Sequence, residues 1–216
     1  MTWSYTRNPA SQIASEAQTN DSYSWDGHVN LTRAYTTNGL NQYESAGTAS
    51  FTYDANGNLI SDGQTTYLYD VENRLVKATR GARTTEMYYA PTGRLFRVDD
   101  TQTGQTNFFY DGNALVAEYD APGNLLRYYV HGSNAEADDP LFLFERDTPT
   151  SSVWHLRSLH ADPRGSIIAL ADWGGNRYQT NTYDEYGIPD TASGNDIATK
   201  GRFRYTGQAW IPELGM

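Results

Sequence analysis

Aspartate is the residue type with the clearest catalytic potential in this chain of 216 residues, which contains no cysteine. A carboxylate beside a scissile bond can act as a general acid or base together with a second aspartate. Asp162, in the run Asp162-Pro163-Arg164-Gly165, is the one catalytic candidate. The same run is typical of a turn, because proline fixes φ and glycine tolerates unusual backbone conformations. We favour the turn at Asp162 and Gly165, and the sequence therefore predicts a protein that is not an enzyme.

Metal and cofactor sites are not predicted either. The run Asp54-x-Asn56-x-Asn58 places oxygen ligands at alternate positions, as a calcium loop does, but glycine stands at the fourth position and no Glu follows at the twelfth. The four histidines have no metal-ligand spacing; they are His28, His131, His155 and His160. Phosphate-binding glycine loops and nucleophile elbows are also missing from the sequence.

Aromatic residues leave a binding function open, since the chain has 17 Tyr and 5 Trp. Exposed rings on a sheet can stack on sugar faces, and Trp25, Trp154, Trp173 and Trp210 are candidates. Trp173 and Trp210 are the two residues that we single out for ligand stacking. The alternative is that the aromatic rings pack between neighbouring hairpins, because they bury large areas and favour strands.

Charge and hydropathy exclude some partners. The formal net charge of −10, with no local run of Lys or Arg, disfavours nucleic acid and anionic lipid. No apolar stretch reaches the roughly 18 residues needed to span a bilayer. The opening residues lack the apolar middle of a signal peptide, so this chain by itself does not indicate its compartment.

A short phrase, Tyr-Asp-x-x-Gly-x-Leu, recurs along the chain and predicts its fold. Copies begin at Tyr53 and Tyr119; the copy at Tyr69 has Asn for Gly, and the copy at Tyr89 lacks the Asp. Glycine and asparagine share a tolerance of positive φ, which indicates a left-handed turn residue at Gly57, Asn73, Gly93 and Gly123. The side chains of Asp54, Asp70 and Asp120 are expected to close these turns by accepting backbone N–H groups.

Each phrase therefore reads as strand, turn, strand. Aromatic and apolar residues alternate before the turns, as in Phe108 and Tyr110, and a leucine follows most of them. The prediction is an all-β fold in which repetitive antiparallel hairpins form a curved, twisted sheet. Little helix is expected, with residues 11–18 as the best candidate for one turn, and loops are expected over 132–152, around a strand at 141–144, and over about 187–201.

The same phrases resemble the YD repeat of RHS-type proteins. Further matches follow in order and resemble the RHS-repeat-associated core, so the resemblance covers nearly the whole chain; they are Asn38–Tyr43, Tyr110–Asp120, His160–Ile167, Tyr183–Gly187 and Arg202–Gln208. The resemblance divides the chain into divergent hairpins (1–50), YD-repeat hairpins (51–131) and an incomplete start of the associated core (132–216), all in one continuous sheet.

Relatives of this kind coil a long sheet into a hollow shell, often around a C-terminal toxin. The resemblance implies a structural shell module that helps to enclose or deliver such an effector, secreted or at the cell surface of a bacterium. The self-cleavage motif and the toxin are not among these 216 residues, and in relatives the phrase at Asp162 lies upstream of the cleavage site.

Expected partners are the rest of the shell and its toxin cargo. Self-association is also expected, because unpaired sheet edges favour edge-to-edge pairing. The alternative function is a surface module that binds carbohydrate or a receptor.

Overall fold

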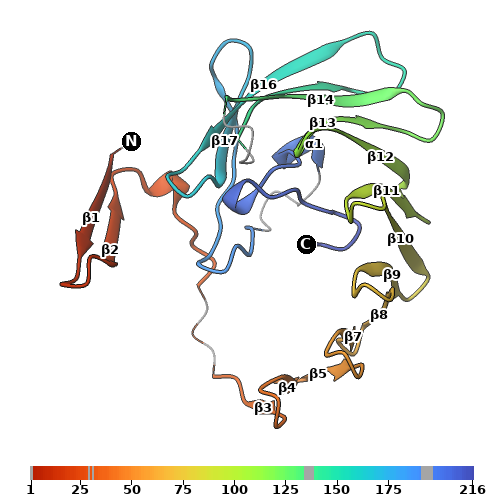
Figure 1. Cartoon of the computed structure of the whole chain (residues 1–216). Helices are drawn as coiled ribbons and strands as arrows, with labels where there is room; N and C mark the ends of the chain where they lie inside the picture. Colours follow the sequence, from red (N-terminus) through yellow and green to blue (C-terminus); the bar gives the residue numbers. More distant parts are fainter. Residues whose placement is uncertain (1, 29, 31, 134–138, 191–196) are drawn as a thin grey trace. The chain divides into compact units, whose positions relative to one another are not determined.

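The computed structural model describes residues 2–28, 30, 32–133, 139–190 and 197–216, and within them the chain is almost entirely β. The all-β, antiparallel prediction is confirmed (Figure 1). Apart from strands there are one helical turn, α1 (Ile197–Lys200), and two 3₁₀ turns, η1 (Asp21–Tyr23) and η2 (Tyr205–Gly207). The strands are β1 (Trp3–Arg7), β2 (Ile13–Gln18), β3 (Tyr35–Thr37), β4 (Tyr43–Ala46), β5 (Ala49–Ser50), β6 (Thr52–Tyr53), β7 (Leu59–Ser61), β8 (Thr65–Tyr69), β9 (Leu75–Arg80), β10 (Arg83–Tyr89), β11 (Leu95–Asp100), β12 (Gly104–Asp111), β13 (Ala114–Tyr119), β14 (Leu125–His131), β15 (Pro140–Arg146), β16 (Trp154–Ala161), β17 (Ile167–Ala171) and β18 (Arg177–Thr180).

The strands form three sheets, not the single continuous sheet that was expected. The largest has 13 strands, β6 to β18, each beside its neighbours in the sequence; β1 pairs with β2, and β3, β4 and β5 form the third sheet. The break after β5 has a local cause, because the extended segment changes partner at Phe51. The strand before Phe51 pairs with β4, and the strand after it pairs with β7. The N–H of Phe51 itself donates to the carbonyl of Glu44 at 2.9 Å.

The chain divides into two compact units, which do not follow the expected segments 1–50, 51–131 and 132–216. Unit 1 comprises residues 1–28 and 157–210, and unit 2 comprises residues 29–156 and 211–216. The segment predicted as an incomplete core thus contributes to both units.

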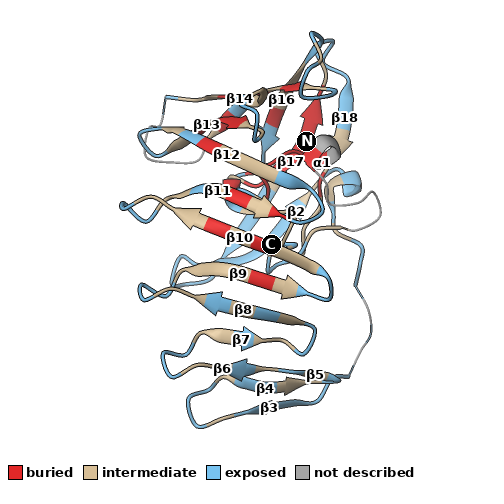
Figure 2. Cartoon of the chain, turned by 90° about the vertical axis from the view of Figure 1, so that its right-hand side faces the viewer, coloured by how far each residue is buried: buried red, intermediate tan, exposed pale blue. Residues whose placement is uncertain are grey.

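Unit 2 is a stack of hairpins with one buried face. Adjacent residues alternate sharply in exposure: Phe108 is 6% exposed and Phe109 56%, and Tyr129 is 1% exposed and Tyr128 45%. Side chains along a strand point to opposite faces, so the buried residues define an inner face and the exposed ones an outer face. Strands β7 to β14 follow an arc whose inner side faces the C-terminal residues (Figure 1), and the buried positions lie mainly on β9 to β13 (Figure 2).

In unit 1 the expectation of a helical turn at residues 11–18 is wrong. Residues 13–18 form β2, which pairs with β1 from Trp3↔Gln18 to Arg7↔Ile13. So short a segment is a marginal helix on its own, and cross-strand pairing decides its conformation. The hydroxyl groups of Thr6 and Ser15 lie 2.5 Å apart across this pair.

The loop predictions are met in part. A strand, β15, covers the predicted 141–144, and β17 follows the turn at Asp162, with all five of its residues buried. The expected loop over about 187–201 contains α1, one helical turn, at its end. Residues 134–138 and 191–196 of the two predicted loops lie outside the described residues.

Candidate functional site

A turn built on one aspartate joins many of the strands, and Asp70 is its clearest example. The N–H of Asp70 donates to the carbonyl of Arg74 at 3.0 Å, and the N–H of Asn73 donates to the carbonyl of Asp70 at 3.1 Å. The carboxylate oxygen Oδ1 of Asp70 accepts the N–H groups of Glu72 at 2.9 Å and Arg74 at 3.0 Å. These backbone hydrogen bonds and those from the Arg74 side chain lower the pKa of Asp70, against a smaller effect of desolvation. The side chain therefore closes the turn in its ionised form.

The left-handed turn residue stands three positions after the aspartate. Asn73 has φ +60°, and Gly57, Gly93 and Gly123 have φ between +81° and +91°. Asparagine tolerates this region better than most residues, because its short side chain can bond locally. Asn73 uses that property, since its Oδ1 accepts the side-chain N–H of Asn58 at 2.8 Å and so ties two turns together.

Asp54 and Asp120 build the same turn. Asp54 Oδ1 accepts the N–H groups of Asn56 and Asn58, each at 2.9 Å, and Asp120 Oδ1 accepts that of Asn124 at 2.7 Å. Of the residues that suggested a calcium loop, Asp54 thus has both carboxylate oxygens engaged within the turn, because its Oδ2 accepts the side-chain N–H of Asn58 at 2.9 Å. No group of three or more potential ligands gathers anywhere in the part of the chain that the structure describes.

Further copies of the turn depart from the Tyr-Asp phrase, because asparagine replaces aspartate or the leucine is lost; those at Asn38 and Asp184 lie in segments that resemble the associated core, but neither was predicted as a turn. Asn8 and Asn38 accept the same pair of backbone N–H groups, two and four residues ahead, at 2.9–3.0 Å. Asp184 accepts two such bonds, and Asp172 accepts the N–H of Asn176. A search that allowed Asn or Asp first and Gly, Asn or Ser three residues later would have found them.

Aromatic side chains just before the turns tie consecutive hairpins together. The hydroxyl of Tyr89 donates to the carbonyl of Leu75 at 2.8 Å, and the hydroxyl of Tyr110 donates to the carbonyl of Leu95 at 2.8 Å. His131 takes the same place, with Nε2 2.8 Å from the carbonyl of Leu115. We call the two tyrosine contacts the hydroxyl–carbonyl ties. Each tie joins one hairpin to the next.

An arginine covers the tyrosine ring in both ties. The guanidinium of Arg74 lies 5.1 Å from the ring centroid of Tyr89, and that of Arg94 lies 4.7 Å from the ring centroid of Tyr110. The repeated Arg-Leu pair therefore holds the next tyrosine through both its ring and its hydroxyl.

The catalytic candidate, Asp162, is 7% exposed and sits in another copy of the turn. Its Oδ1 accepts the N–H groups of Arg164 at 2.8 Å and Ser166 at 2.9 Å, and its Oδ2 accepts the side chain of Arg164 at 3.2 Å. Gly165 has φ +86°. Both oxygen atoms are engaged in holding the turn, which is the role that the turn interpretation gives them.

The inner face of unit 2 carries buried ion pairs as well as apolar residues. Asp100, with a fully buried carboxylate, accepts the Nε of Arg83 at 2.8 Å and the hydroxyl of Thr85 at 2.7 Å. Burial alone would raise the pKa of Asp100, but hydrogen bonds from Arg83, Thr85 and the N–H groups of residues 102 and 103 outweigh it and hold the pKa well below its usual range. Glu118, also fully buried, pairs with Arg127 at 3.2 Å and accepts the hydroxyl of Tyr129.

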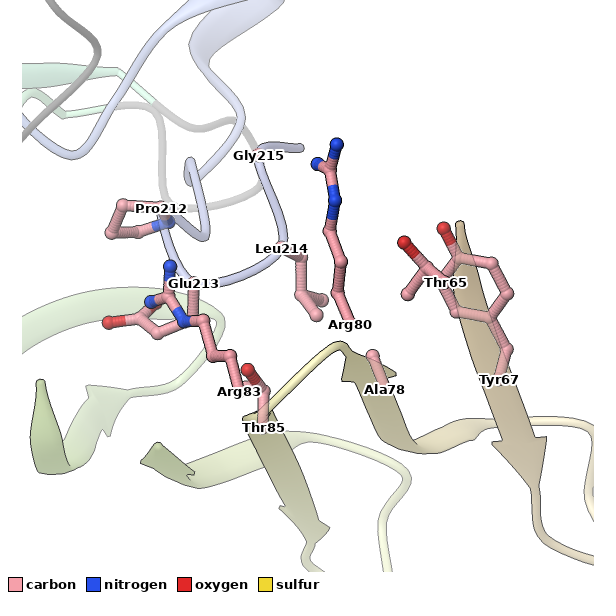
Figure 3. Close-up of a pocket in the computed structure, with 10 residues that line it drawn as sticks. All are labelled: Thr65, Tyr67, Ala78, Arg80, Arg83, Thr85, Pro212, Glu213, Leu214 and Gly215. Carbon is pink, nitrogen blue, oxygen red and sulfur yellow. The ribbon is translucent and has the colours of Figure 1, made fainter. Parts of the chain in front are cut away.

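The C-terminal residues 211–216 lie over the inner side of β8 to β10 and enclose a small cavity of about 180 Å³ (Figure 3). The segment folds back on itself, because the N–H groups of Leu214 and Gly215 both donate to the carbonyl of Ile211 at 3.0 Å. Figure 3 shows the Leu214 side chain directed toward β9, the strand that carries Ala78 and Arg80. Glu213 reaches the hydroxyl of Thr103 at 3.3 Å. The inner face of unit 2 thus holds a polypeptide segment of its own chain.

The outer face of unit 2 has a hollow of about 650 Å³ lined by exposed aromatic rings. Phe109 and Tyr119 meet edge to face, with ring centroids 4.9 Å apart. Phe96, which is 40% exposed, and the side chain of Asn107 also line it.

The two tryptophans predicted to stack on ligands have different surroundings. Trp173 is 85% exposed and lies in the turn that Asp172 closes. The backbone N–H of Trp210 donates to the carbonyl of Arg202, and the guanidinium of Arg202 donates to the carbonyl of Trp210. The guanidinium of Arg204 lies 5.5 Å from the ring centroid of Trp210. Of the rings that line hollows, Trp25 was among the candidates from the sequence, but Phe109 and Tyr119 were missed. Exposure of a ring on a strand depends on register, which the sequence leaves open.

Comparison with known proteins finds solved structures and sequence relatives that resemble the chain. No protein-family model matches the chain. Solved structures that resemble it include TcdB2-TccC3-Cdc42, with a TM-score of 0.43 and 13% identity, and TcdB2-TccC3 without its hypervariable C-terminal region, with a TM-score of 0.42 and 14% identity. Each match covers 95% of this chain and 12% of the other.

The sequence relatives of the chain include two WapA proteins. The tRNA nuclease WapA of Bacillus subtilis (strain 168) is 30% identical over 181 residues, and the tRNA(Glu)-specific nuclease WapA of Bacillus subtilis subsp. natto (strain BEST195) is 29% identical over the same length. Each alignment includes 82% of this chain. The chain spans only 7% of the length of either protein, so its similarity is to a short segment of each.

Proposed function

We propose that the chain is a structural segment of an RHS/YD-repeat protein of the toxin type, in which its hairpins form part of a wall. The observation that carries the proposal is the repeated unit of one Asp- or Asn-closed turn and one hydroxyl–carbonyl tie, which joins hairpin to hairpin. Such a unit extends a sheet without limit in either direction, as repeat architectures require.

Three further observations support this proposal. Asp162, the one catalytic candidate, has both carboxylate oxygens engaged in its turn. The relatives are much longer proteins that are named nucleases, and the chain matches only 7% of their length. The inner face of unit 2 already holds a segment of polypeptide, residues 211–216.

We propose that this face contacts enclosed polypeptide in a complete wall, and that the complete protein is secreted or on the cell surface. None of the helices in the described part of the chain has the length and apolar character needed to cross a bilayer.

A chimera tests the structural role. In the tRNA nuclease WapA of Bacillus subtilis (strain 168), the segment that aligns with this chain is replaced by this chain. Cleavage of tRNA by the chimera and its resistance to trypsin are then measured. The expected result is a chimera that cleaves tRNA and resists trypsin, while the isolated chain leaves tRNA intact. A matched chimera with Gly57→Val, Gly93→Val and Gly123→Val should lose trypsin resistance, because valine at positive φ is strained. Cleavage of tRNA by the isolated chain, or equal trypsin sensitivity of the two chimeras, contradicts the proposal.

The outer hollow favours a second candidate function, carbohydrate binding. Partly exposed rings of Phe96, Phe109 and Tyr119 beside the Asn107 amide combine stacking surface with a polar group. Binding on a glycan array that is lost in Phe109→Ala but kept in Leu68→Ala, an exposed position of β8, would support it. Loss of glycan binding in Trp173→Ala or Trp210→Ala instead would indicate the site that the sequence suggested. The absence of binding to any glycan on the array would refute this candidate function.

A further inference from the structure

Unit 1 contains a cavity that plays no part in the wall. Its volume is about 440 Å³, within the range of roughly 300–1,000 Å³ that small-molecule sites occupy. The hairpin β1–β2, the segment 21–28 that follows it, and the turns at Arg164 and at 183–185 supply its lining. The residues come from both parts of the sequence that make up unit 1, so the cavity depends on the folded unit.

Aromatic rings form one part of the lining. Trp3, Tyr23 and Trp25 all line the cavity and are only half-buried, which leaves ring surface open to a ligand. The ring of Trp25 is held edge-on against His28, with centroids 4.6 Å apart. Aromatic faces, those of tryptophan above all, attract cations through their quadrupole.

Unpaired carboxylates form the other part. Glu16, Asp21 and Glu185 line the cavity, and no ion pair joins them to any residue for which side chains are described. Arg164 is the one guanidinium among the described residues of the lining, and Asp162 binds it at 3.2 Å through two of its nitrogen atoms. The charge of Glu16 also acts on Arg164, although the two side chains form no ion pair. The lining therefore carries a surplus of negative charge.

A hydrogen-bond acceptor in the lining has no partner. The side-chain nitrogen of Gln18 donates to the hydroxyl of Ser24 at 2.5 Å, which orients the amide. Its oxygen, Oε1, is buried and accepts no hydrogen bond within the described structure. Oε1 is covered in this structure, so a donor in the cavity reaches it only when the amide of Gln18 turns toward the ligand. A buried acceptor without a partner is costly, which favours that turn when a donor is bound.

We propose that this cavity binds an alkylammonium group, the protonated amine found at the end of a lysine side chain or on a free amine. The aromatic rings attract its positive charge and the carboxylates offset it. Its N–H groups supply the donor that Gln18 Oε1 lacks, which a quaternary ammonium ion cannot do. An anion would meet the surplus carboxylates, and a neutral sugar would leave them unbalanced.

Titration of the full chain with n-butylamine at low ionic strength tests the proposal, with tryptophan fluorescence and calorimetry as readouts. Saturable binding is expected, with weaker binding of tetramethylammonium, which has no N–H. Two capped peptides, acetyl-Ala-Lys-Ala-amide and the same peptide with norleucine for lysine, separate the sources. Tighter binding of the lysine peptide than of butylamine assigns the site to a polypeptide, and equal binding assigns it to a free amine. The proposal is refuted if the norleucine peptide binds as tightly as the lysine peptide, or if no amine gives saturable binding.

Variants locate the site. Asp21→Asn combined with Glu185→Gln should weaken butylamine binding about tenfold, the equivalent of about 1.4 kcal/mol, whereas Glu44→Gln makes one such change in unit 2 and should have no effect. Circular dichroism and thermal unfolding confirm that each variant is folded. Unchanged binding in the double variant, or equal loss in Glu44→Gln, shows that the cation binds elsewhere and overturns the assignment.

Discussion

Removal of one hydroxyl–carbonyl tie should destabilise the stack of hairpins by a measurable amount. In Tyr89→Phe the ring stays under the guanidinium of Arg74, and only the hydroxyl that donates to the carbonyl of Leu75 is lost. A hydrogen bond of this kind contributes about 0.5–1.5 kcal/mol net to stability. Burial raises the pKa of Tyr89 further above 10, so its hydroxyl remains protonated and able to donate throughout the neutral range.

Two ties in one unit allow the effect to be checked for additivity. Tyr110→Phe removes the equivalent bond to Leu95, and the double variant should lose about 1–3 kcal/mol, because the two bonds share no partner. With a urea m-value of about 1–3 kcal/mol/M, a loss of 1 kcal/mol lowers the unfolding midpoint by about 0.3–1 M. The assay is urea unfolding at pH 7, followed by circular dichroism.

The control is Tyr128→Phe, a change of the same chemistry on the outer face, where the tyrosine is 45% exposed. This variant should unfold at the wild-type midpoint. If Tyr89→Phe and Tyr128→Phe have the same midpoint, the ties contribute no stability and the proposed role of the repeated tyrosine is wrong.

Substitutions at three other positions test the turns and the inner face. Ala90→Asp should raise the urea midpoint, because the backbone at Ala90 already forms the Asp-type turn, with Gly93 N–H on the carbonyl of Ala90 at 2.8 Å, and lacks only the carboxylate; Ala90→Glu, with a longer side chain, should not. Asn73→Val should cost about 1–2 kcal/mol from strain at φ +60°, whereas Asn73→Gly keeps the turn and loses only the two bonds from the side chains of Asn56 and Asn58; equal midpoints would refute the strain. The pKa of Asp100 is lower in the folded state, so its stabilising effect is complete above about pH 4 and is lost as the pH falls further; the stability difference between wild type and Asp100→Asn should shrink in acid, and a difference independent of pH would contradict this.

The turns could be predicted from the sequence because they depend on short-range chemistry. An aspartate that accepts N–H groups two and four residues ahead, with a residue tolerant of positive φ between them, is determined within five residues, as at Asp54 and Gly57. The antiparallel hairpins follow from those turns. The same locality explains why Asn8 and Asn38 were recognisable in principle, since asparagine offers the same side-chain oxygen.

The remaining features depend on register and on contacts between distant residues. The exchange of partners at Phe51 separates β5 from β6, although the two strands are only one residue apart. Nothing local distinguishes residues 13–18 from a helical turn until β1 pairs with them. The cavity in unit 1 joins Trp3 to Glu185, which no periodicity of the sequence connects.

The division of labour within each hairpin explains where function can reside. Turn aspartates and ties occupy the ends of the strands, so they fix the stacking of hairpins without using the two faces. The faces are then free to differ: the inner one buries charged pairs such as Glu118 and Arg127 and holds residues 211–216, and the outer one exposes rings such as Phe109. A substitution on a face should therefore change what the stack of hairpins contacts, whereas a substitution at a turn should change whether the stack forms. Phe109→Ala and Gly123→Val separate these outcomes, because only the second is expected to lower the unfolding midpoint substantially.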